Sequence, residues 1–162
     1  MVTEEQKEII NQHVAMAAGA AVPGTFFPAS DLPGLIVIWA TMITRIGMDC
    51  GYSFTYDHIL KQLTAATAGV GFYFAGGKLF GALLHLIPGI GTLTYLAVNA
   101  TLNAIFTNRL GKLTSDLFNE PGFDLDTLGK ALEGIVQASF NSLPSPSEVK
   151  EGYQAAKRSK KI

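Results

Sequence analysis

The chain has 162 residues, which is the usual size of one domain, and only 15% of them are charged, against roughly 25% in an ordinary soluble domain. Its 12 basic and 13 acidic residues nearly cancel, which argues against a nucleic-acid-binding protein. The single cysteine, Cys50, excludes an internal disulfide framework and a cysteine-based zinc site.

The charge deficit lies in the middle of the chain. Residues 31–108 contain three acidic and three basic side chains, and the 30 residues from Leu79 to Asn108 contain none. This stretch exceeds the roughly 20 residues that span a bilayer as one helix. However, Pro88, Gly89 and Gly91 interrupt it, and its second half contains threonine and asparagine side chains that lipid disfavours. We interpret it as a helical hairpin that is buried in the protein, inserted in a membrane, or able to switch between the two.

The N-terminal segment is predicted to form a helix from Thr3 to about Ala21, because Thr3 and Gln6 have the spacing of a capping box. Prolines then end the helix. The loop that follows contains the adjacent Phe26 and Phe27, which either cover the core or insert into a membrane interface.

A second helix is predicted over residues 31–50. Its first half is apolar on nearly all sides, which indicates burial on more than one side. Gly47 and Gly51 lie four residues apart, a spacing that lets another helix approach closely. A C-terminal cap at Gly51 is the simpler interpretation of the second glycine. A third helix is predicted to begin near Thr55.

The central hairpin is predicted as two helices, residues 75–87 and residues 92–118, joined by a turn at Pro88–Gly91. The glycine-rich stretch before it does not match a phosphate-binding loop. Leu79 follows Gly77-Lys78 at the position where a serine or threonine would hold magnesium.

The C-terminal third is more polar. Asp124 is predicted to cap a helix over residues 125–141. Ser145, with Pro146 at the first helical position and Glu148 at the third, is a strong start signal for a last helix. The end of this helix is basic and is either solvated or in contact with anionic lipid. Its four basic residues are Lys157, Arg158, Lys160 and Lys161.

These elements predict an all-α fold. We expect a compact bundle of about six to seven helices around a hydrophobic central helical hairpin, since no sustained alternation of apolar and polar residues indicates a strand. The bundle is predicted as one domain over residues 1–162, with an apolar core at 31–108 and polar C-terminal helices at 124–162.

No catalytic or metal-binding constellation is evident. His13, His58 and His85 lie on separate predicted helices without the partner spacing of a metal motif. The carboxylate of Asp49 would raise the pKa of the Cys50 thiol and make it a poor nucleophile. The chain is therefore predicted not to be an enzyme, and no cofactor is expected.

Three stretches carry a family resemblance: residues 14–32, residues 42–52 and residues 78–111, with Pro88-Gly89-Ile90-Gly91 inside the third. Together they span roughly residues 10–118, and their order resembles the YcjF-like (DUF697-like) helical domain of bacteria, which often follows a GTPase module. The resemblance implies an all-α, membrane-linked domain and a GTPase-linked partner. It implies no catalytic residue.

The leading functional hypothesis is association with a membrane through the apolar hairpin. The cytoplasmic face is expected, because the acidic N-terminus lacks the pattern of a secretory signal. The candidate membrane or partner contacts are Phe26, Phe27, Pro88, Gly89, Ile90, Gly91, Lys157, Arg158, Lys160 and Lys161. The first alternative is a soluble homo-oligomeric assembly protein. The second is a carrier of a hydrophobic ligand such as a lipid. The cavity of such a carrier would be lined by Trp39, Phe72, Phe74 and Phe80.

Overall fold

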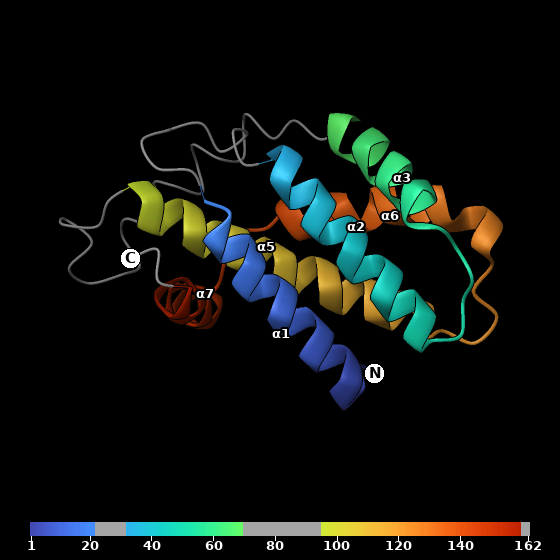
Figure 1. Cartoon of the computed structure of the whole chain (residues 1–162), viewed down its shortest axis with the longest axis horizontal. Coiled ribbons are helices and arrows are strands. Elements are labelled where there is room, and N and C mark those ends of the chain that lie inside the picture. The colour runs from blue at the N-terminus through green and yellow to red at the C-terminus, as the bar shows by residue number, and fades with distance from the viewer. Residues whose placement is uncertain (22–31, 70–94, 160–162) are drawn as a thin grey trace.

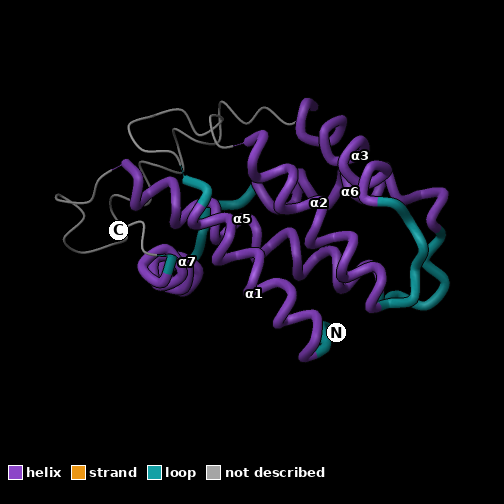
Figure 2. Tube along the Cα trace, viewed as in Figure 1, coloured by secondary structure: helices purple, strands orange, loops and turns teal. Residues whose placement is uncertain are grey.

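The computed structural model describes residues 1–21, 32–69 and 95–159. These residues form helices and no strands, so the predicted all-α fold is confirmed (Figure 2). The helices are α1 (Glu4–Gly19), α2 (Leu32–Asp49), α3 (Tyr56–Gly69), α5 (Tyr95–Phe118), α6 (Leu128–Phe140) and α7 (Pro146–Arg158), with a short 3₁₀ turn, η2 (Leu125–Thr127), before α6.

Several predicted features lie outside the described residues. They include the predicted helix over residues 75–87, and only the second arm of the predicted hairpin is described, as α5. The candidate residues in this group are Phe26, Phe27, Phe72, Phe74, Phe80, Pro88, Gly89, Ile90, Gly91, Lys160 and Lys161.

The long helix α5 is the centre of the bundle, with α1, α2, α6 and α7 packed around it (Figure 1). Helix α1 runs antiparallel to α5, since Ala17 lies beside Asn103 and Ile10 lies beside Gly111. Helix α2 runs in the same direction as α5, because Trp39 contacts Thr107 and Met42 lies beside Gly111. Helix α3 packs on α2 and α6, and so extends the bundle away from α1.

Both predicted capping boxes are confirmed. The backbone N–H of Gln6 donates to Thr3 Oγ1 at 3.2 Å, and the backbone N–H of Thr3 donates to Gln6 Oε1 at 3.2 Å. At the start of α7, the N–H of Glu148 donates to Ser145 Oγ at 3.3 Å and the N–H of Ser145 donates to Glu148 Oε2 at 2.8 Å. Each pair satisfies two helix-end donors that have no partner within the helix.

The helix predicted over residues 125–141 begins differently. Asp124 accepts a hydrogen bond from the N–H of Asp126 at 3.0 Å, but the turn that it caps is η2. The N–H of Thr127 bonds to the carbonyl of Asp124, three residues earlier, and this tighter pattern delays the α-helix to Leu128.

The end of α2 shows the separate roles of its two glycines. Gly51 has a φ of +81°, and the N–H groups of Gly51 and Tyr52 bond to the carbonyls of Met48 and Gly47 in a Schellman motif. The predicted C-terminal cap is therefore confirmed. Gly47 does permit a close approach, but by the ring of Phe54, which occupies the position of a Cβ atom.

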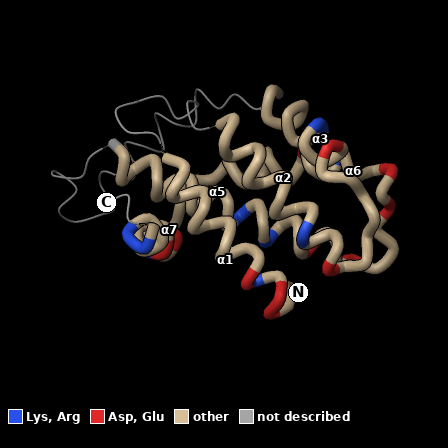
Figure 3. Tube along the Cα trace, in the orientation of Figure 1, with Lys and Arg blue, Asp and Glu red and all other residues tan. Residues whose placement is uncertain are grey.

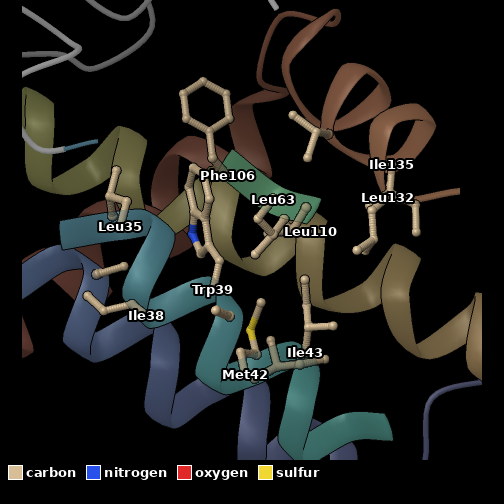
Figure 4. Close-up of a cluster of buried hydrophobic side chains, with 14 of the residues drawn as sticks. Leu35, Ile38, Trp39, Met42, Ile43, Leu63, Phe106, Leu110, Leu132 and Ile135 are labelled. Atoms are coloured by element: carbon tan, nitrogen blue, oxygen red, sulfur yellow. The ribbon is translucent and has the colours of Figure 1, made fainter. Parts of the chain in front are cut away.

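The core between α2, α5 and α6 contains the only tryptophan of the chain (Figure 4). Trp39 is completely buried, and its Nε1 donates to Thr107 Oγ1 at 2.8 Å. Its ring lies 5.8 Å from that of Phe140, which in turn lies 4.3 Å from the ring of Phe106.

The polar residues of the uncharged stretch are buried in the bundle. Thr101 is 1% exposed and donates to the carbonyl of Ala97, and Asn103 is 5% exposed and donates to the carbonyl of Ala17. Hydrogen bonds of this kind satisfy polar groups without water. The described part of the hairpin's second arm is therefore core in this structure.

Helix α7 approaches α5 most closely at Gly152. A Cβ atom there would lie 2.7 Å from Ile105 Cγ1 and 2.9 Å from the carbonyl oxygen of Thr101. We expect Gly152→Ala to lower the free energy of unfolding by about 1–2 kcal/mol, because α7 must shift to make room. The measurement is urea denaturation followed by Trp39 fluorescence.

Gly134, on α6, provides the matched control. It is exposed within a helix, and nothing lies within 4 Å of its Cβ position. Gly134→Ala should raise the free energy of unfolding by about 0.5–1 kcal/mol, because alanine is the better helix former. Equal effects of the two substitutions would contradict the close α5–α7 contact.

Candidate functional site

Within the described residues, one helix, α2, is long and apolar enough to cross a bilayer, with 18 residues and a mean hydropathy of 1.3. The core helix of a soluble protein meets the same criterion. Trp39, Met42, Ile43 and Ile46 of α2 are completely buried in the bundle, which accounts for much of its apolar composition.

One end of the bundle is formed by helix segments without Asp, Glu, Lys or Arg. The helices α1 and α3 end there, and α2 and α5 begin there (Figure 1; Figure 3). The uncharged segments are residues 9–21, 32–44, 62–69 and 95–108. We call these four segments together the charge-free end. Their assembly at one end depends on the alternating directions of the helices.

Basic and acidic groups are distributed unequally around the charge-free end. Helix α7 reaches it with its basic terminus, since Ser159 lies against Gly19 of α1, directly after the exposed Lys157 and Arg158. Most acidic residues instead lie toward the opposite ends of the helices, whereas Glu148 and Glu151 lie on α7 and Glu133 on α6 (Figure 3). The residues toward the opposite ends are Glu4, Glu5, Glu8, Asp49, Asp57, Asp116, Glu120, Asp124 and Asp126.

The charge-free end exposes apolar side chains. Met16 of α1 is 52% exposed and Val37 of α2 is 48% exposed. In the sequence, residues 22–31 and 70–94 connect the helices at this end, and Asp31 and Lys78 are their only charged residues. Two connections with one charged residue each are thus joined to the charge-free end.

The predicted ligand cavity has one described lining residue, Trp39. Its indole is packed between α5 and α6 with its N–H bonded to Thr107. Of the predicted basic contacts, Lys157 lies with its Nζ 5.6 Å from the ring centre of Tyr153, and Arg158 is exposed.

Arg109, in the interior of α5, contacts the end of α6 and the start of α7, an arrangement that could not be predicted from the sequence. Its Nε donates to Glu148 Oε1 at 2.6 Å and its Nη2 to Glu148 Oε2 at 2.9 Å. The guanidinium also donates to the carbonyls of Ser139, Ser142 and Leu143 at the end of α6. All of its donor groups have protein partners, so it links α5 to α6 and α7.

The Arg109 contact also sets the charge state of Glu148. Hydrogen bonds from the Arg109 guanidinium, assisted by those from Ser145, lower the pKa of Glu148 to about 2. Both carboxylate oxygens are bonded within the protein, which indicates a structural role.

Gln6 forms a second polar junction, at the acidic end. Its Nε2 donates to Asp49 Oδ2 at 2.9 Å and to Cys50 Sγ at 3.2 Å, and its Oε1 accepts from Asn119 Nδ2 at 2.9 Å. Burial and the charge of Asp49 raise the pKa of the Cys50 thiol. The predicted rise of the Cys50 pKa is confirmed. Burial is its larger cause, and this could not be predicted from the sequence.

The histidines do not come together in the described part of the chain. His13 is buried on α1, where its Nδ1 lies 2.7 Å from the carbonyl oxygen of Ile9 and burial lowers its pKa. His58 is exposed on α3, and His85 lies outside the described residues. Among the described residues, no group of three or more His, Cys, Asp or Glu side chains is arranged to hold a metal ion.

A cleft of about 520 Å³ lies between α1, α5 and α7. The cleft could not be predicted from the sequence, because its walls come from three helices that are distant in the sequence. Apolar, basic and acidic residues line it.

Comparisons with protein-family models, with curated proteins and with solved structures gave no match. The resemblance to the YcjF-like domain stays a prediction.

Proposed function

We propose that this chain is a non-enzymatic helical protein that associates with the cytoplasmic face of a membrane through its charge-free end. The observation that carries the proposal is the assembly of four uncharged helix segments at one end of the bundle. Charged side chains are costly in the hydrocarbon region, so a surface that enters a bilayer must lack them.

Charge polarity supports the same orientation. Lys157 and Arg158 lie beside the charge-free end, where cations near an anionic leaflet contribute about 1 kcal/mol each. The acidic groups at the opposite end would then face away from the lipid (Figure 3). Lys160 and Lys161 follow in the sequence and add two further cations.

In this proposal the hairpin around Pro88–Gly91 is the inserting element. Residues 70–94 connect α3 to α5 at the charge-free end. Transfer of apolar side chains from protein contacts to lipid contacts changes the hydrophobic free energy little, so a small difference in affinity can shift the equilibrium. The GTPase-linked partner implied by the family resemblance remains a further prediction.

Co-sedimentation with anionic vesicles at low salt tests the proposal. We expect the wild-type chain to sediment with vesicles and the double variant Met16→Glu/Val37→Glu to bind about tenfold more weakly. Both substitutions place a carboxylate on the charge-free end and remove exposed apolar area.

Met48→Glu is the matched control. Met48 is 65% exposed at the other end of α2, so its substitution should leave vesicle binding unchanged. Failure of the wild-type chain to sediment, before and after mild acidification, would rule out the proposal. A discrete oligomer in light scattering without vesicle binding would favour the soluble assembly protein instead.

A further inference from the structure

The cleft between α1 and α7 has the size of a ligand site. Its volume of about 520 Å³ falls within the roughly 300–1,000 Å³ of small-molecule pockets. Helix α5 forms its floor, through Ala104, Ile105, Asn108 and Lys112. The close packing of α7 on α5 at Gly152 fixes one wall.

Apolar side chains form part of the lining of the cleft, beside polar and charged ones. Each of the three helices contributes aliphatic side chains, so that an acyl chain would contact hydrocarbon on three sides. These side chains belong to Ile10, Val14, Ala104, Ile105 and Ala155.

The charged lining has an excess of cations. Lys7, Lys112 and Arg158 face the carboxylates Glu148 and Glu151. Glu148 is already compensated, because both of its oxygens accept hydrogen bonds from the guanidinium of Arg109. Lys7 is likewise paired, with Glu4, so among the described residues two unpaired cations, Lys112 and Arg158, remain with one carboxylate, Glu151.

Two of these cations are free to meet a ligand. Lys7 forms an ion pair with Glu4 at the surface. Within the described part of the chain, Lys112 and Arg158 have neither a hydrogen bond nor an ion pair, and both are exposed. An anionic group beside Lys112 would gain a charge-assisted hydrogen bond.

We infer that this cleft binds one anionic amphiphile, with its acyl chain along the floor formed by α5 and its carboxylate or phosphate head beside Lys112. The cleft borders the surface that is proposed to meet the membrane, since Val14 and Ala104 belong to both, but Met16 and Val37 do not line it.

Fluorescence titration with 11-(dansylamino)undecanoic acid, below its micellar concentration, tests this inference. We expect saturable one-to-one binding, about tenfold weaker binding of the methyl ester of the probe, and a similar tenfold loss with Lys112→Gln. Lys130→Gln, on α6 and outside the cleft, should leave the affinity unchanged. Competition by dodecanoate and by dodecyl phosphate then distinguishes a carboxylate head from a phosphate head.

Two further variants test the location of the site. Ala155→Phe should abolish binding by filling the cleft, provided that circular dichroism shows the native helix content. Asn11→Glu changes an exposed residue of the cleft and should weaken binding by charge repulsion without affecting the core. The inference is overturned if the acid shows no saturable binding, if acid and ester bind equally, or if Asn11→Glu and a folded Ala155→Phe both bind like the wild type.

Discussion

Replacement of Arg109 by alanine is expected to lower the free energy of unfolding by about 3 kcal/mol. The substitution leaves the Glu148 carboxylate without its bidentate partner and leaves the carbonyls of Ser139, Ser142 and Leu143 without donors. Urea denaturation followed by Trp39 fluorescence measures the loss.

Arg45 is the matched control for Arg109. It is exposed on α2 and donates one hydrogen bond, to Gln12 Oε1, so Arg45→Ala should cost less than about 0.5 kcal/mol. Arg109→Lys should cost about 1–2 kcal/mol, because an ammonium keeps the charge but not the fork of donors. Similar costs for Arg109→Ala and Arg45→Ala would contradict the proposed junction of α5, α6 and α7.

The cost of Arg109→Ala should also depend on pH. The pKa of Glu148 falls from the reference value of 4.5 to about 2 on folding, so the ion pair stabilises the protein fully above about pH 4.5. This stabilisation is lost as the pH falls toward 2, when the folded protein also takes up the proton. The difference between wild type and Arg109→Ala should shrink from about 3 to about 1 kcal/mol, the remainder coming from the bonds to carbonyls. A difference that is constant down to pH 2.5 would contradict the ion pair.

Trp39→Ala is expected to cost about 4 kcal/mol, the largest effect of any substitution considered. The indole is completely buried and contacts α5 and α6, so truncation leaves a large cavity and removes the hydrogen bond to Thr107 (Figure 4). Because the variant has no tryptophan, circular dichroism must follow its unfolding.

Two comparisons separate packing from hydrogen bonding at Trp39. Trp39→Phe keeps an aromatic ring and should cost about 1–2 kcal/mol, and its effect should be non-additive with Thr107→Val if the bond between them contributes. Tyr153→Ala removes a half-buried ring from α7 and should cost less than about 1 kcal/mol. A cost for Trp39→Ala no larger than that for Tyr153→Ala would contradict dense packing around the indole.

Local features of this fold could be predicted from the sequence because the interacting groups are sequence neighbours. The capping boxes at Thr3 and Ser145 each join residues three apart, and the cap at Gly51 depends on its own backbone angle. The direction of the Cys50 pKa shift followed in part from the adjacent Asp49. In each case no knowledge of helix packing was required.

Features that depend on helix packing could not be predicted in this way. Arg109 and Glu148 are 39 residues apart, and their meeting depends on how α7 lies on α5. The sequence places the charge deficit at residues 31–108, but the charge-free end of the structure also includes the last half of α1. That grouping follows only from the alternating helix directions. The same holds for the cleft, whose three walls come from α1, α5 and α7.

Glu148 couples the first turn of α7 to α5, because its carboxylate bonds both the N–H of Ser145 and the guanidinium of Arg109. Most helices can open their first turn at little cost while the rest stays in place. In α7 the same carboxylate closes the first turn and holds the guanidinium of α5, which in turn holds the end of α6. Opening of that turn therefore breaks the tertiary contact as well. Acid that protonates Glu148 should loosen the start of α7 and its links to α5 and α6 together.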